Sequence, residues 1–344
     1  MSSIFDLVTA EAITAYWEQK PNALGPYLGE ELFPNDKKLG LDLKWIKGSK
    51  GLPVVLAPSA YDVKAKKRNR IGFDRLSAQM PFFKEGHGID EELRQQLNMV
   101  LETGNQTYID SIMNQVFDDT TDLLNGAAAQ RERMRMMALT TGAISISANG
   151  QDYDYNYGFP EDHKSTVQTS WSNPAADIYG DLETALDKIE TDTGVRPTRA
   201  VVAQKTWKYF RINTNIRNAI LGNASAVPVS DSQIHTYFMD ELNLDIQKYT
   251  KKCKTEAGVE TPYVPDDLVT LFPSGSLGTG WFGTTPEESD LMSGTAANVS
   301  ITDTGVAVCT MKEVDPVQVN TKASMIYLPS FEAADQVYLL DVIA

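Results

Sequence analysis

The chain has 344 residues, 42% of them hydrophobic and 22% charged, which is enough for about two domains with ordinary globular cores. Its 31 Lys and Arg stand against 46 Asp and Glu, a formal net charge of −15, which argues against nucleic-acid binding because attraction to phosphate requires a positive surface. Two cysteines exclude a disulfide framework. No stretch reaches the roughly 20 apolar residues of a membrane span, and the N-terminus lacks the basic and apolar parts of a signal peptide.

The first 88 residues contain little that could form a core. A short amphipathic helix is predicted at about 9–19, before Pro21. Strands at 41–46 and 52–56, and an extended leg from residue 71, predict a long two-legged β-loop that ends at a turn over 86–88. Because such a loop has no core of its own, we expect it to rest on a neighbour. Basic residues crowd it, chiefly Lys64, Lys66, Lys67, Arg68 and Arg70.

A helical period of 3.6 residues begins near residue 89. After an interruption at Gly104-Asn105, one continuous helix is predicted from Thr107 to Leu139, roughly 50 Å long at 1.5 Å per residue. Apolar residues form one stripe along it, whereas its charged residues are expected on a solvated face. These charged residues are Asp118, Asp119 and Asp122 in the middle and Arg131, Arg133 and Arg135 near the end.

A hairpin should follow the long helix, with Asn149-Gly150 as a type I′ turn. Residues 175–305 then resemble a second domain of helices and strands, including a helix at 176–193 that stops at Gly194 and another that Ser230 caps. Strands are expected at 306–311, 314–319 and 336–343, and these could return to the hairpin at 143–157.

A search for chemistry finds little. Residues 278–283 match the pattern G-x-G-x-x-G, but no helix follows to hold a pyrophosphate. The histidines His87, His163 and His235 have no partner at metal-ligand spacing; His87 is expected in a turn. A Ser-His-Asp triad remains open, because geometry and not chain order defines it, although no nucleophile elbow is present. Glu287-Glu288 and Asp118-Asp119 read as ordinary acidic pairs. We therefore predict no enzyme, and no catalytic, cofactor-binding or metal-binding residue.

The order of these parts resembles that of tailed-phage major capsid proteins with the Hong Kong 97-type fold, and most closely the lambda-type branch, the protein E family. The resemblance rests on residues 31–34, 131–142, 264–271 followed by 278–283, and 319–329 followed by 335–339. It implies an α+β fold with an N-terminal arm, an extended β-hairpin called the E-loop, a long spine helix, a peripheral (P) domain and an axial (A) domain. The implied ranges are 1–40 for the arm, 41–88 for the E-loop, 89–174 for the P-domain with the spine helix and hairpin, 175–305 for the A-domain, and 306–344 for C-terminal strands returning to the P-domain.

For function, the resemblance implies a major capsid protein that assembles into hexamers and pentamers of an icosahedral shell around double-stranded DNA. It implies a separate scaffolding protein and a portal protein, leaves room for a decoration protein, and places the chain in the virion after assembly in the host cytoplasm. No membrane partner and no sequence-specific DNA contact are expected. The basic E-loop residues would contact the acidic face at Asp118, Asp119 and Asp122 of a neighbouring subunit. The alternatives are another phage structural component, such as a tail or decoration protein, and a two-domain acidic hydrolase.

Overall fold

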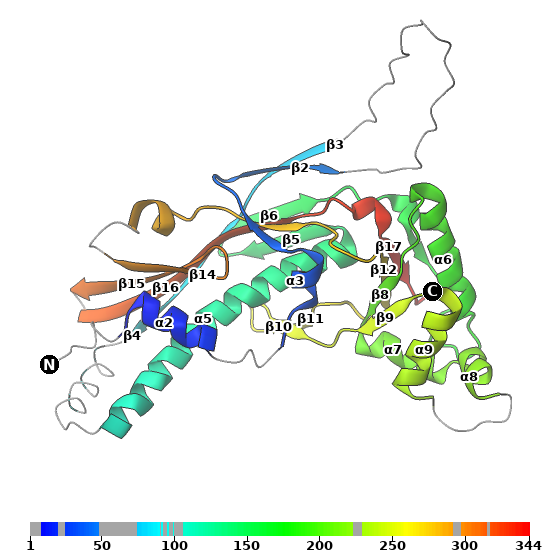
Figure 1. Ribbon diagram of the computed structural model, residues 1–344, viewed down its shortest axis with the longest axis horizontal. Coiled ribbons are helices and arrows are strands. Elements are labelled where there is room, and N and C mark those ends of the chain that lie inside the picture. Colours follow the sequence, from blue (N-terminus) through cyan, green and yellow to red (C-terminus); the bar gives the residue numbers. More distant parts are fainter. Residues whose placement is uncertain are drawn as a thin grey trace, which may run out of the picture. The chain divides into compact units, whose positions relative to one another are not determined.

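The computed structural model divides into two units by its internal contacts, each built from segments far apart in sequence (Figure 1). The first unit contains Met1–Leu43, Ala78–Arg135 and Thr279–Ser330, and the second contains Lys44–Ser77, Met136–Gly278 and Phe331–Ala344. The structure describes residues 8–19, 25–47, 74–89, 91, 95, 99, 106–222, 229–291, 297–314 and 317–344.

Helices appear close to where the apolar periodicity predicts them. Helix α2 spans Ala10–Gln19 and the long helix α5 spans Gln106–Thr141. The predicted apolar stripe is on the inner side of α5, where Val116 and Leu124 are buried. One short helix, α3 at Leu28–Leu32, lies in a segment where the sequence predicted no helix. Its five residues are too few for a helical period to be recognised.

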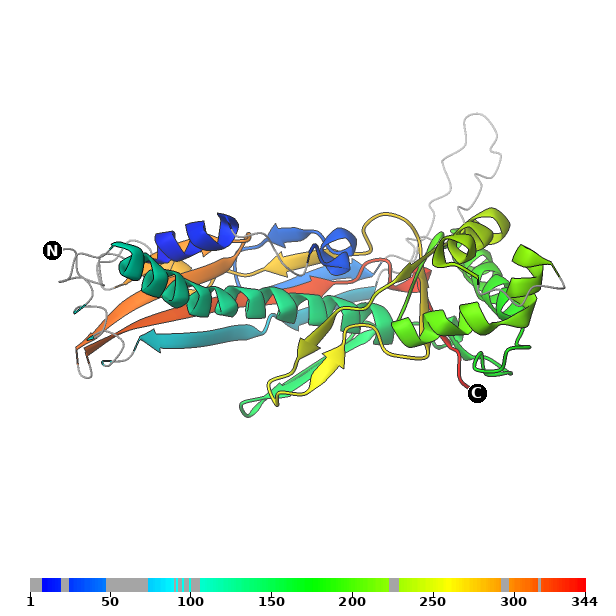
Figure 2. The same cartoon turned by 90° about the horizontal axis from the view of Figure 1, so that it is seen from below.

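A six-stranded sheet forms the body of the first unit. Its order is β1-β13-β16-β15-β14, and β4 pairs with the other end of β16. Neighbours run antiparallel except for the parallel pair β1 and β13. Figure 2 shows α5 running lengthwise along this sheet. The strands span Asn35–Lys37 (β1), Phe82–Ile89 (β4), Thr279–Phe282 (β13), Asn298–Thr302 (β14), Val306–Val314 (β15) and Val317–Ser330 (β16).

The predicted turn at residues 86–88 is wrong. Gly86, His87 and Gly88 are inside strand β4 and pair with Lys322, Thr321 and Asn320 of β16. A Cβ built on Gly88 would lie 2.7 Å from the Asn320 Oδ1 atom. The glycine therefore permits a close approach between side chain and backbone within the sheet, a strand role that sequence alone does not separate from a turn.

The second unit contains a five-stranded sheet in the order β7-β17-β12-β8-β9. β12 is antiparallel to both β8 and β17, while the outer pairs are parallel. Gly194 ends α6 in the left-handed conformation and Ser230 begins α9 with a capping box, as predicted. The strands are Lys164–Thr166 (β7), Arg199–Val202 (β8), Asp245–Lys248 (β9), Leu268–Phe272 (β12) and Tyr338–Asp341 (β17), and the helices are Ile178–Thr193 (α6), Gln204–Ile212 (α7), Thr214–Leu221 (α8) and Asp231–Leu242 (α9).

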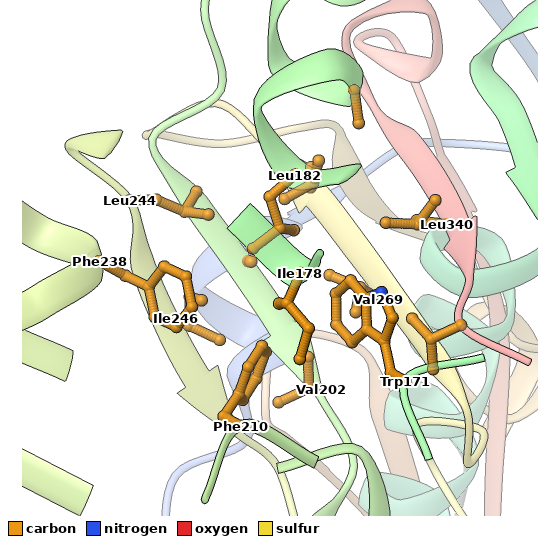
Figure 3. Close-up of a cluster of buried hydrophobic side chains, with 14 of the residues drawn as sticks. Trp171, Ile178, Leu182, Val202, Phe210, Phe238, Leu244, Ile246, Val269 and Leu340 are labelled. Carbon is orange, nitrogen blue, oxygen red and sulfur yellow. The ribbon is translucent and has the colours of Figure 1, made fainter. Parts of the chain in front are cut away.

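The core of the second unit is apolar and mostly aliphatic, with a group of aromatic side chains around Phe210 (Figure 3). Phe210 is fully buried, and its ring centroid lies 5.5 Å from those of Trp171 and Trp207 and 5.2 Å from that of Phe238. Offset and edge-to-face ring pairs at such distances add stability beyond the area that they bury. Val202, Val269 and Leu340 of the central strands close this core from the sheet side.

Three strand pairs stand outside the two larger sheets. They are β2 (Asp42–Lys47) with β3 (Asp74–Gln79), β5 (Ala143–Ala148) with β6 (Gln151–Asn156), and β10 (Lys252–Lys254) with β11 (Glu260–Pro262). Asn149 and Gly150 both have positive φ, of 53° and 73°, as a type I′ turn requires. The β2–β3 pair matches the predicted base of the β-loop, and residues 48–73 lie outside the described residues.

The expected pairing of the C-terminal strands with the 143–157 hairpin is wrong. β15 and β16 pair with each other and with strands of the first unit, and β17 joins the sheet of the second unit. Two strands from the range 175–305, β13 and β14, also belong to the first unit's sheet. Periodicity identifies strands, but their partners depend on contacts between segments far apart in sequence.

Candidate functional site on the long helix

Helix α2 is fixed against α5 and β14 by directed contacts. The Tyr16 hydroxyl donates a hydrogen bond to the Asp118 carboxylate at 2.8 Å, and the Tyr16 ring stacks on Phe117 with centroids 5.4 Å apart. On the sheet side, the Ala10 amide donates to Asn298 Oδ1 at 2.8 Å. The N-terminal helix is therefore held to two elements of the first unit through both polar and aromatic groups.

The three acidic residues of α5 that the sequence singled out have different surroundings. Asp118 is half-buried and accepts the bond from Tyr16, whereas Asp119 and Asp122 are exposed. Their predicted partners Lys64, Lys66, Lys67, Arg68 and Arg70 lie outside the residues that the structure describes. The exposed pair on α5 is thus the part of this acidic face that is open to another molecule.

Further along α5, the prediction of a solvated charged face is wrong for Arg131 and Arg135, whereas Arg133 is half-buried. Arg131, Glu132 and Arg135 are at most 1% exposed. Their helical positions explain this, because 131 and 135 continue the buried stripe of Val116, Thr120 and Leu124 at steps of three and four. The alignment of positions 131 and 135 with the apolar stripe was the sequence signal that indicated their burial. A search for hydrophobic residues alone overlooks this signal, because arginine is rarely buried.

Each of these buried charges has a partner in the first unit. The Arg135 Nε donates to the Tyr327 hydroxyl at 2.7 Å, its Nη2 donates to Asn35 Oδ1, and its guanidinium lies 5.4 Å from the centroid of the Tyr327 ring. Arg131 pairs with Asp303 and lies 5.4 Å from the centroid of the Phe282 ring. Burial raises the pKa of the Tyr327 phenol, and the two nearby guanidinium groups only oppose this shift.

Glu132 connects α5 to the short helix α3. Its carboxylate accepts from the Gly29 amide at 3.1 and 3.2 Å. A Cβ on Gly29 would lie 2.3 Å from Glu132 Oε2 and 2.7 Å from Arg135 Cδ, so only glycine fits there without displacing charged groups. Together Glu132 and Arg135 hold α3 and β1, and we call Arg131, Glu132 and Arg135 the buried charge cluster.

The acidic pair Glu287-Glu288 is engaged in ion pairs. Glu287 is buried, contacts the Lys322 ammonium and accepts a hydrogen bond from the Ser324 hydroxyl at 2.8 Å, while Glu288 accepts from Lys37 at 2.5 Å. Burial opposes ionisation of Glu287, but these bonds outweigh it and hold its pKa below the usual value. A carboxylate that stays ionised in this way is unsuited to donate a proton in catalysis.

The histidines do not lie together. His87 is exposed in β4, and His235 lies 2.9 Å from an oxygen of Asp245. His163 is buried and lies near Asp162 and Asp192, with ligand atoms within 4.8 Å of one another. However, Lys188 lies 3.0 Å from Asp162 and 2.7 Å from Asp192. The two carboxylates therefore already have a cation between them, and the arrangement is that of an ion-pair network.

Two further sequence observations are explained by the sheet of the first unit. The G-x-G-x-x-G stretch contains strand β13, and a five-residue π-helix, Glu287–Leu291, follows only after residues 283–286. A Cβ on Gly280 would lie 2.4 Å from the Tyr327 hydroxyl, so this glycine serves packing. Cys309 is buried, and burial raises the pKa of its thiol. Among the helices that the structure describes, none has the length and hydropathy needed to cross a bilayer.

The class of protein follows from comparison with solved structures. A candidate capsid protein of a prophage from Escherichia coli CFT073 aligns over 98% of this chain and 99% of its own, with a TM-score of 0.60 and 14% identity. A phage-related protein from Bordetella bronchiseptica RB50 covers 97% of each chain at a TM-score of 0.56 and 14% identity. The capsid protein of cyanophage A-1(L) aligns over 94% of this chain and 98% of its own, with a TM-score of 0.51 and 10% identity. The fold is the α+β capsid fold of the Hong Kong 97 type.

The family model for phage major capsid protein E matches residues 9–342, and the chain belongs to this family. No curated protein sequence matches the chain. The protein is therefore a structural component of the phage head shell. This assignment confirms the resemblance noted from the sequence and removes the tail and decoration alternatives.

Proposed function

We propose that copies of this chain assemble into hexamers and pentamers that form a closed icosahedral shell around double-stranded DNA. The observation that carries the proposal is the match of the capsid family over residues 9–342. In such a shell each copy contacts its neighbour through two different surfaces, so that the contacts close into rings.

The domain assignment that we propose follows the capsid fold. Residues 1–40 are the N-terminal arm, 41–88 the E-loop, 89–174 the P-domain, 175–305 the A-domain, and 306–344 the returning strands. The pairing of β2 with β3 at the base of the E-loop supports its two-legged form. The helices α6 to α9 around β8, β9 and β12 support an A-domain, whose core also takes in residues of β17.

Between subunits, the basic residues of the E-loop would contact the exposed acids of a neighbour's α5. Asp119 and Asp122 are the exposed members of this acidic face, while Asp118 is engaged by Tyr16. Deleting residues 55–75 should leave a folded protein by circular dichroism but abolish shells. The reversal Asp119→Lys with Asp122→Lys should do the same, whereas Asp240→Lys, at an exposed acid of α9, serves as the control. Normal shells from the deletion would contradict this contact.

The remaining partners are proposed from the family. A separate scaffolding protein would guide assembly in the host cytoplasm and a portal protein would occupy one vertex, and the finished shell leaves room for a decoration protein. The net charge of −15 supports an inner surface that encloses DNA without binding a particular sequence. We propose a role without catalysis, which the ion pairing of Glu287 and Glu288 supports.

The test of the proposed function is negative-stain electron microscopy of the purified protein, expressed alone and with a scaffolding protein. Closed shells with scaffold, and aberrant or absent shells without it, are expected. A mobility-shift assay with duplex DNA at physiological salt should show no complex. Discrete monomers under every condition would contradict the assembly proposal, and a salt-sensitive shift at micromolar protein would contradict the passive role towards DNA.

A further inference from the structure

Two hairpins of the second unit extend beyond its five-stranded sheet. They are β5–β6 and β10–β11, and each pairs only within itself among the described strands. Figure 2 shows both projecting from this unit on the same side. The polar outer face of such a hairpin adds nothing to the core of its own unit, which raises the question of what that face contacts.

The β5–β6 hairpin has one buried and one acidic face. Ile144 and Ile146 are buried, whereas Asp152 and Asp154, which face the opposite side of the ribbon, are exposed. The range 143–158 contains no Lys or Arg. Asp152 accepts a hydrogen bond from Ser147 across the hairpin, so its carboxylate is held in place while its charge is not neutralised.

The β10–β11 hairpin presents the opposite charge at the same spacing. Lys252 and Lys254 are exposed on one face of β10, with half-buried Cys253 between them on the other face. Glu260 lies opposite Lys254 in the ladder. Within the part of the chain that the structure describes, neither lysine forms an ion pair.

We propose that Lys252 and Lys254 of one copy pair with Asp152 and Asp154 of the next copy in the shell, an inference that rests on the proposed assembly. Residues two apart on a strand are about 6.6 Å apart along it, so the two lysines and the two aspartates have the same spacing along their strands. The contact joins two different surfaces of the same chain, which is the kind that closes into a ring. Single exposed ion pairs are weak, but a closed ring repeats this contact at every subunit boundary.

The test uses charge reversal and charge exchange. The variants are Asp152→Lys with Asp154→Lys, Lys252→Glu with Lys254→Glu, and all four changes together. The fourfold variant keeps the net charge of the chain and restores opposite charges across the contact. The control is Lys208→Glu with Asp240→Lys, two exposed positions outside both hairpins. Circular dichroism verifies folding, and sedimentation velocity with negative-stain microscopy measures the assembled fraction.

Each acidic or basic reversal should lower the assembled fraction about tenfold or more, because like charges then face each other. The fourfold exchange should recover most of it, and the control should assemble as the unsubstituted chain does. Normal shells from both reversals, or no recovery in the fourfold variant, would overturn this contact and leave the proposed function intact. If the unsubstituted chain itself does not associate at any concentration, with or without scaffold, both proposals are overturned.

Discussion

Both units bury apolar side chains, but the first unit also buries charged side chains among them. In the second unit, Phe210 is enclosed by the rings of Trp171, Trp207 and Phe238. Burial of apolar surface stabilises this part of the fold. In the first unit, the buried charge cluster holds α3 and β1 against α5 through directed bonds. Apolar contacts tolerate small shifts, whereas a buried charge without its partner is strongly unfavourable.

The apolar core stabilises the second unit as a whole, whereas the buried charge cluster fixes the position of two short segments, α3 and β1. The aromatic core gives the second unit stability that depends on no single bond. The arm segments α3 and β1 are instead held by directed bonds, since moving them would break the bonds from Gly29 to Glu132 and from Arg135 to Asn35. Such specificity suits a segment whose placement must be identical in every copy of a shell.

The largest effect is expected from breaking the aromatic core. Phe210→Ala should lower the free energy of unfolding by about 4 kcal/mol, because it leaves a cavity among three aromatic rings. Ile212→Ala, two residues away but 43% exposed, should change it by less than about 0.5 kcal/mol. Chemical denaturation followed by tryptophan fluorescence measures both, and equal effects would contradict the assignment of the core.

The next effect concerns the buried charge cluster. Arg135→Met should cost about 3 kcal/mol, because Tyr327 and Asn35 lose their hydrogen-bond donor and Glu30 loses the cation 4.0 Å from its carboxylate. The loss should persist at 1 M salt, since buried pairs are poorly screened. Arg135→Lys keeps the positive charge but not the forked geometry of the guanidinium. Its free energy of unfolding should therefore lie between those of the unsubstituted protein and of Arg135→Met. A loss below about 1 kcal/mol for Arg135→Met would show that the cluster does not hold the arm.

A smaller, pH-dependent effect is expected at Glu287. Its pKa is held below the ordinary value of 4.5, so its stabilisation is fully present above that value and is lost as the pH falls through the lowered one. Glu287→Gln should cost about 2 kcal/mol near neutral pH and should flatten the acid limb of the stability profile. Denaturation midpoints between pH 3 and 7 test this, and an unchanged acid limb would contradict it.

The smallest effects are expected at two glycines, where a substitution alters the backbone and removes no core side chain. Gly194 ends α6 with φ of 73°, so Gly194→Ala should cost about 1 kcal/mol. Gly126 is exposed within α5 and has nothing within 4 Å of a built Cβ, so Gly126→Ala should add about 0.5–1 kcal/mol. Thermal melts of the two variants should therefore shift in opposite directions.

Local signals in the sequence predicted most of the helices and the hairpin turn. The periodicity of α5, the Asn149-Gly150 turn and the Ser230 cap each depend on neighbouring residues, and each was confirmed. The placement of β4 beside β16 was missed because Gly86 and Gly88 resemble a turn. The partners of β15 and β16 were missed because pairing depends on segments far apart in sequence.

The site was only partly predictable for a related reason. The acidic residues of α5 were recognised by their charge, and two of them are exposed. Arg131 and Arg135 were expected in solvent, since burial of an arginine requires partners that are not local in sequence. Asp303 and Tyr327 supply those partners from 172 and 192 residues away, beyond the reach of any local pattern.

The most direct test of the shell assignment is cryo-electron microscopy of the assembled particles. The account predicts a closed icosahedral shell whose hexamers and pentamers consist of this chain, with each E-loop on the α5 of a neighbouring copy. Particles whose shell is made of another protein, or open assemblies in which the E-loop contacts its own subunit, would contradict it.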